Sequence, residues 1–193
     1  MESFKLFVKL GLDHVLDFNA YDHILFLVAL AVVYTFKDWK KVLWLITFFT
    51  IGHTLTLALS AYKILNIDIK VVEFLIPVTI LVTAASNILT FKGKTVSKSN
   101  INLAFALFFG LIHGLGFSNY FRMIIQDVDS KFLPLLEFAL GIEFAQVIIV
   151  LGILLISFAG QTVFKISKRD WVFIVSAIVL GITIPMLAER KFW

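Results

Sequence analysis

Long apolar segments dominate this chain and limit what it can fold into. Six of them are long enough for a helix to cross the hydrocarbon layer of a bilayer, which takes about 17 to 25 residues. They cover residues 21–37, 42–62, 70–91, 101–121, 132–158 and 171–188. Because 60% of the residues are hydrophobic and only 16% are charged, a soluble domain is excluded. The sequence therefore predicts an all-α integral membrane protein, a bundle of about six transmembrane helices, with residues 1–193 in a single membrane domain.

The segment before the first span has a different pattern. In residues 1–20, apolar positions are separated by Lys5, Lys9 and Asp13, so the segment is too polar to span a membrane. It also lacks the small-residue cleavage site of a signal peptide. We expect a short amphipathic helix that lies in the membrane interface or folds back over the bundle.

Basic residues are unevenly distributed between the loops. Nine Lys and Arg residues follow the first, third and fifth spans, against four in the alternate loops. The nine are Lys37, Lys40, Lys41, Lys92, Lys94, Lys98, Lys165, Lys168 and Arg169; the four are Lys63, Lys70, Arg122 and Lys131. This bias predicts a multi-pass protein of the bacterial inner membrane with both termini outside the cytoplasm. The net charge of +4 comes from small scattered groups, which predicts no nucleic-acid partner.

All four histidines lie within or at the mouth of an apolar segment. Ionisable side chains in a bilayer interior cost about 2.5 to 3.5 kcal/mol each, so a chain that retains several is expected to use them. In the predicted orientation they share the outer half of the membrane with Asp22 and Glu143. Without cysteine there are no thiolate ligands, and imidazole with carboxylate suits zinc, nickel, cobalt or iron(II). The candidate metal ligands are His14, Asp22, His23, His53, His113 and Glu143.

Further polar residues accompany these candidates. Second-shell positions or a path for an ion are predicted at Thr54, Glu73, Asn87 and Gln146. For Asn87 two roles are open, because it either lines an ion path or ties two helices together. Gly110 and Gly114 flank His113 four residues apart, which favours close approach of a neighbouring helix. Such glycine faces also suit contact between copies of the chain in a homo-oligomer.

Five motifs recur in a recognisable order. They are His14 with the segment DHILFL at 22–27, FTIGHTLTL at 49–57, Glu73 with Ser86-Asn87, FGLIHGLGF at 109–117 and GIEFAQ at 141–146. Over about residues 11–150 this order resembles the HupE/UreJ family of bacterial membrane proteins. The resemblance implies a permease for nickel or another divalent metal. It also implies functional roles for His14, Asp22, His23, His53, His113 and Glu143.

Two classes of function compete for these residues. The first is a divalent-metal permease that takes the ion into the outer cluster and passes it inward by Asn87. The second is a membrane-embedded zinc hydrolase acting on a lipid or membrane-anchored substrate, with Glu143 or Asp22 accepting a proton from water. A haem or quinone protein with His53 and His113 as axial ligands, and a metal-sensing or chaperone-like partner of another enzyme, stay open as well.

Overall fold

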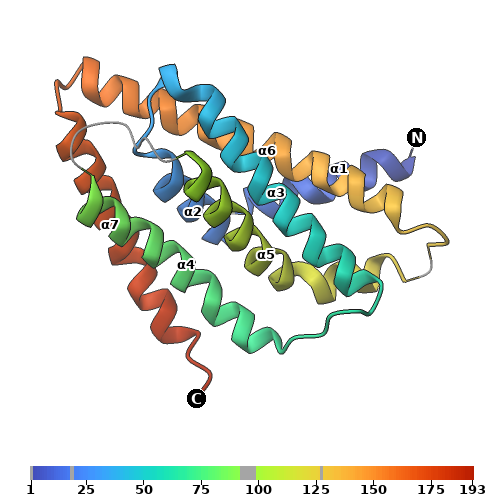
Figure 1. The fold of residues 1–193 in the computed structure, drawn as a ribbon. Coiled ribbons are helices and arrows are strands. Elements are labelled where there is room, and N and C mark those ends of the chain that lie inside the picture. Colours follow the sequence, from blue (N-terminus) through green and yellow to red (C-terminus); the bar gives the residue numbers. More distant parts are fainter. Residues whose placement is uncertain (1, 18–19, 92–98, 127) are drawn as a thin grey trace.

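The chain folds into a bundle of helices (Figure 1). The structure is a computed structural model that describes residues 2–17, 20–91, 99–126 and 128–193, and these residues contain helices but no strand. The helices are α1 (Glu2–Leu16), α2 (Asp22–Ala31), the short 3₁₀ helix η1 (Phe36–Asp38), α3 (Trp39–Ala61), α4 (Ile69–Thr90), α5 (Ser99–Ile124), α6 (Phe132–Thr162) and α7 (Lys168–Glu189).

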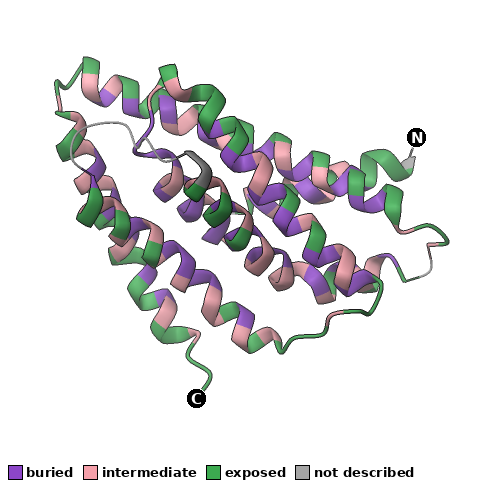
Figure 2. Ribbon diagram, in the orientation of Figure 1, coloured by how far each residue is buried: buried purple, intermediate pink, exposed green. Residues whose placement is uncertain are grey.

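Five of the helices, α3 to α7, are long and apolar enough to cross a membrane. They coincide with the expected second to sixth spans to within a few residues, so the all-α membrane fold class is confirmed. Two of them begin at side-chain caps that satisfy free backbone N–H groups: Asp68 accepts from Lys70 before α4, and Ser167 accepts from Asp170 before α7. Buried and exposed residues alternate along the long helices, so each helix has buried positions and exposed positions (Figure 2).

The first crossing differs from the expected span of residues 21–37. Helix α2 has only ten residues, which at 1.5 Å per residue gives about 15 Å, or half a bilayer core. The apolar run does continue to Tyr34, but Val32, Val33 and Tyr34 lie outside the helix. They are 1%, 5% and 4% exposed, so protein rather than lipid surrounds this irregular backbone.

In the predicted topology, α1 and α2 together take the place of the first crossing. Both run antiparallel to α5, and side chains along the two helices meet α5 in reverse order. The contacts are Phe7 with Phe121, His14 with Phe117, His23 with His113, Phe26 with Phe109, and Tyr34 with Asn102. The first crossing is therefore a discontinuous helix, broken between Leu16 and Asp22.

Helix α1 is packed against the bundle by a close crossing with α6. A Cβ atom added at Gly11 would lie closer than 3.0 Å to the backbone of Phe138 and Ile142, and one at Gly141 would come as close to Val8. Only glycine allows the two backbones to approach this far. Phe7 and Val15 of α1 are buried. The helix therefore packs on the bundle through α6, and its placement relative to the membrane interface stays a prediction.

A second glycine seam joins α3 to α5. A Cβ atom at Gly52, Gly110 or Gly114 would lie closer than 3.0 Å to a backbone carbonyl oxygen of the opposite helix. The helix that approaches the face of Gly110 and Gly114 is thus α3 of the same chain. Gly152 and Gly181 have nothing within 4 Å of an added Cβ, so no other helix of the described residues approaches them closely. Contact between copies of the chain through glycine faces stays a prediction.

The two termini and the α3–α4 and α5–α6 connections lie at one end of the bundle, and η1 and the α6–α7 connection lie at the other (Figure 1). Loop charge predicts that the first end is outside the cell. In the cysteine-free chain, Ser130→Cys should react with a membrane-impermeant thiol reagent in intact cells, and Lys37→Cys should react only after the membrane is opened. Both side chains are exposed, so access to the reagent decides the result. Labelling of Lys37→Cys in intact cells would show that the orientation is the reverse of the predicted one.

Candidate metal centre

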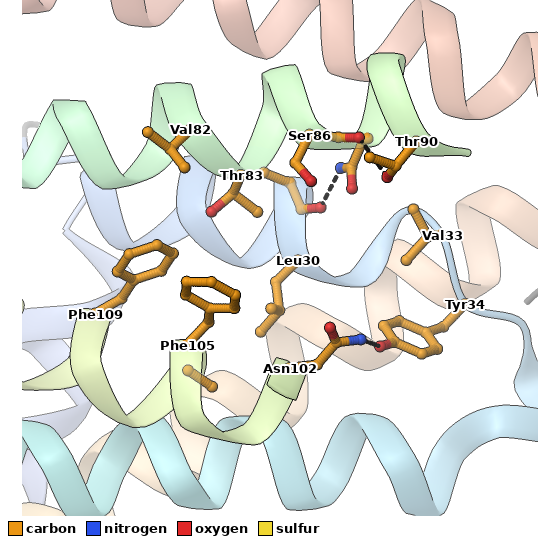
Figure 3. Close-up of a pocket in the computed structure, with 13 residues that line it drawn as sticks. Leu30, Val33, Tyr34, Val82, Thr83, Ser86, Thr90, Asn102, Phe105 and Phe109 are labelled. Atoms are coloured by element: carbon orange, nitrogen blue, oxygen red, sulfur yellow. Dashed lines mark hydrogen bonds between the residues drawn. The ribbon is translucent and has the colours of Figure 1, made fainter. Parts of the chain in front are cut away.

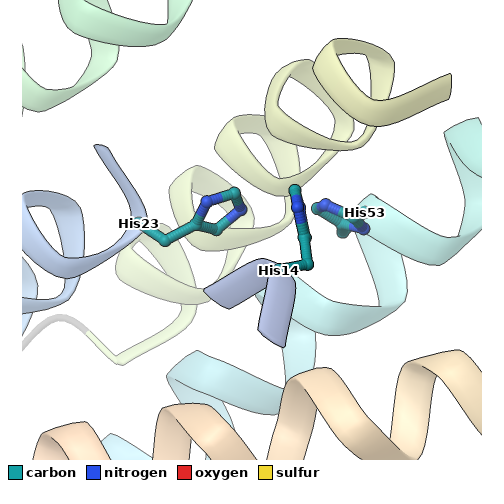
Figure 4. A group of neighbouring side chains, drawn as sticks. All are labelled: His14, His23 and His53. Atoms are coloured by element: carbon teal, nitrogen blue, oxygen red, sulfur yellow. The ribbon is translucent and has the colours of Figure 1, made fainter. Parts of the chain in front are cut away.

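Three histidines meet where the first crossing is broken (Figure 4). His14 lies in the last turn of α1, His23 in the first turn of α2, and His53 in the middle of α3. One ligand atom from each lies within 4.8 Å of the other two. The ring centroids are 4.6 Å apart for His14 and His23, and 5.5 and 5.7 Å from His53. We call these three residues the histidine triad.

The triad presents nitrogen atoms that the protein itself does not satisfy. Nε2 of His14, Nε2 of His23 and both ring nitrogens of His53 are buried and have no hydrogen-bond partner among the described residues. A buried polar atom without a partner costs about 1 to 3 kcal/mol, so such atoms usually have a role. Neutral imidazole nitrogens that converge in this way are suitable ligands for zinc, nickel, cobalt or iron(II).

Asp22 orients His23 rather than joining the triad. Its Oδ1 accepts the backbone N–H of His23 at 2.9 Å and lies 3.1 Å from His23 Nδ1. Because a carboxylate only accepts, we assign the ring proton to Nδ1, which leaves the Nε2 lone pair free for a metal. Asp22 was predicted as a metal ligand, and in the structure it holds the ring of the neighbouring His23 in place.

His113 lies beside the triad. Its ring centroid is 5.3 Å from that of His23, and its Nδ1 donates to the carbonyl of Phe109 at 2.8 Å. The Nε2 atom is buried without a partner among the described residues, as in the triad. His113 was predicted as a metal ligand with the other histidines, but the three ligand atoms that converge come from His14, His23 and His53, and His113 lies outside this group.

Glu143 belongs to a separate polar cluster. Its two carboxylate oxygens accept from Thr47 at 2.6 Å and from Thr50 at 2.5 Å. Thr50 also lies 3.1 Å from Gln146 Oε1. Since Thr50 and His53 are three residues apart on one face of α3, this cluster lies about one helical turn from the triad. The structure does not bring Glu143 into the group of ligand atoms.

The other predicted residues are distributed around the bundle. Thr54 is adjacent to His53 in α3, and its buried hydroxyl has no hydrogen-bond partner in the part of the chain that the structure describes. The side chain of Glu73 is exposed at the start of α4. Asn87 donates to the carbonyl of Ala29 at 2.7 Å, which ties α4 to α2. Asn87 also borders a cavity between α2, α4 and α5, and its role on an ion path stays a prediction.

Two residues near the site were not among the predicted site residues. Arg190, after the last span, lies 3.4 Å from Asp22 Oδ2 and 3.5 Å from the carbonyl of Glu73. Glu137 is only 4% exposed, and its Oε2 is buried without a partner among the described residues. Its position four residues before Gly141, on the face of α6 that approaches α1, was the available indication that it is buried.

Five long apolar helices, a broken first crossing and a buried histidine triad define a multi-pass membrane protein with a candidate metal-binding centre. A family model described as HupE / UreJ protein matches residues 1–189. The chain therefore belongs to the HupE/UreJ family, as the motifs predicted. Searches of curated proteins and of solved structures gave no match.

Proposed function

We propose that this protein is a permease for a divalent transition metal of the nickel type. One observation carries the proposal: the histidine triad points unpartnered, buried nitrogens at one place inside a membrane-spanning bundle. The family is associated with nickel and cobalt transport, and this chemistry fits the ligand set. Nickel is therefore the first ion to test, and zinc the second.

The break in the first crossing supports transport. Substrate sites of membrane transporters are often built where a helix is interrupted, because the free backbone ends and the helix dipoles face the ion. The carboxyl end of α1, which carries the negative end of its dipole, lies at His14. A cation at the triad is favoured by that end of the helix.

The two carboxylates near the triad differ in whether a positive charge lies beside them. Asp22 has Arg190 as a cationic neighbour at 3.4 Å. Glu143 has hydroxyl partners only, and the ion pairs of the described residues do not include it. In a low-dielectric interior, a cation at the triad would compensate the charge of Glu143 one turn away. Glu143 thus contributes through charge rather than as a ligand.

The hydrolase hypothesis has less support. It requires a carboxylate beside the metal to accept a proton from water. Asp22 is engaged with His23 and Arg190, and Glu143 is bonded to two threonines outside the triad. The arrangement therefore favours binding and passage of an ion over activation of water.

Nickel uptake into sealed proteoliposomes tests the proposal. The unmodified protein should take up nickel, and uptake should fall as the pH is lowered, because imidazole ligands bind metal only in the neutral form. Glu143→Gln should reduce uptake about tenfold, the effect typical of a residue next to the ligands, whereas Glu143→Asp keeps part of it. Both variants should retain metal at the triad.

Gln161→Ala is the control, since Gln161 is a polar residue of α6 that donates to the carbonyl and the hydroxyl of Ser157 in its own helix. Stoichiometric metal with no uptake by the unmodified protein would contradict the permease and favour the hydrolase.

A further inference from the structure

A cavity of about 160 Å³ lies between α2, α4 and α5, on the side of His113 away from the triad (Figure 3). Tyr34, Thr90 and Asn102, which line it, are close to the ends of the helices at the predicted cytoplasmic side. This volume is several times what a single water molecule requires. The cavity is therefore large enough for an ion with part of its hydration shell.

Three of the polar side chains that line the cavity donate a hydrogen bond to a backbone carbonyl. Asn87 donates to Ala29 O at 2.7 Å, Thr83 to Thr79 O at 2.8 Å, and Thr90 to Ser86 O at 2.7 Å. Because a carbonyl only accepts, the amide and hydroxyl oxygens of these residues keep lone pairs for the cavity. Donors are present as well, since the Tyr34 hydroxyl accepts from Asn102 Nδ2 at 3.2 Å and keeps its own hydrogen. The lining is therefore neutral and polar, which suits a hydrated ion.

Two aromatic rings separate the cavity from the histidines. Phe109 lines the cavity, and its carbonyl accepts from His113. The ring of Phe26 lies 5.9 Å from that of Phe109 and 5.1 Å from that of His113. Phe26 is fully buried and Phe109 is 8% exposed, so they form an apolar partition of the kind that gates by excluding water.

We propose that this cavity is the inner vestibule of the permease, in which a divalent cation released from His113 past Phe26 and Phe109 regains its water. The inference rests on the proposed function and adds the release path to it. Neutral oxygens bind transition metals more weakly than imidazoles do. Conduction needs such a gradient, because an ion that is bound equally tightly at every site does not leave.

Removing the oxygens tests the vestibule. Thr83→Val and Asn87→Leu should each lower nickel uptake about tenfold, because loss of one oxygen contact raises the free-energy barrier to passage of the ion. The amount of metal bound at the triad should be unchanged. Thr79→Val is the matched control, because Thr79 is one turn away on α4, bonds to its own helix and does not line the cavity. Uptake by both cavity variants at the level of the control would overturn the proposal.

A cysteine in the cavity tests whether it contains water, independently of transport. In nanodiscs, Thr83→Cys should react with a positively charged water-soluble thiol reagent at least about ten times faster than Ile174→Cys, which is exposed on the neighbouring α7, because lipid excludes the reagent. The modified Thr83→Cys should then lose uptake. Equal rates would show a dry cavity and overturn the vestibule. Absence of uptake by the unmodified protein would overturn the permease, and the labelling rates would still decide whether the cavity is hydrated.

Discussion

Replacing His53 with alanine should lower bound nickel by more than tenfold and abolish uptake, as loss of a metal ligand typically does. His53 is fully buried, and neither of its ring nitrogens has a partner among the described residues. No hydrogen bond among the described residues therefore explains why an imidazole is placed there. The measurement is elemental analysis of the purified protein, combined with uptake by the same preparation in proteoliposomes.

His14 and His113 separate the structural grouping from the one expected from the sequence. His14→Ala should lose metal binding as His53→Ala does, because His14 is a member of the triad. His113→Ala should keep the metal and slow its uptake, because His113 lies outside the triad and next to the partition at Phe109. Loss of metal from His113→Ala together with full metal content in His14→Ala would show that His113, and not His14, binds the metal with His23 and His53.

Valine at Gly114 should both destabilise the bundle and displace the metal site. The added side chain meets the carbonyl oxygen of His53, and this backbone atom cannot move without carrying the imidazole with it. Overpacking of a tight interior costs 1 to 3 kcal/mol and occasionally more, and a clash with backbone should cost at least about 3 kcal/mol. We expect a lower midpoint of thermal unfolding in detergent and reduced metal content.

Gly152→Val is the matched control for Gly114→Val, because an added Cβ at Gly152 has nothing within 4 Å. It should leave both measurements unchanged. Equal unfolding midpoints for the two variants would show that the α3–α5 seam is not close-packed.

The long spans were predictable because length and hydropathy define them directly. The break at α2 was not, since an apolar run of residues 21–37 does not reveal that its last residues leave the helix and are covered by protein. Counting residues from the ends of the spans gave each histidine a depth, but depth does not say which helices are neighbours. For this reason Glu143 was expected beside the histidines. In the structure its carboxylate accepts hydrogen bonds from Thr47 and Thr50, about one turn of α3 away from the triad.

The triad draws its members from three helices, and one of these, α1, precedes the break. An ion held by His14, His23 and His53 would therefore cross-link the amino-terminal helix to the body of the bundle. Detaching α1 would then require release of the ion. At a free ion concentration about a thousand times the dissociation constant, this adds about 4 kcal/mol to the free energy of detachment. The amino-terminal segment of the metal-loaded protein should accordingly resist proteolysis. In the metal-free protein α1 is held by its packing on α6 at Gly11 and Gly141, so this segment should be cleaved faster.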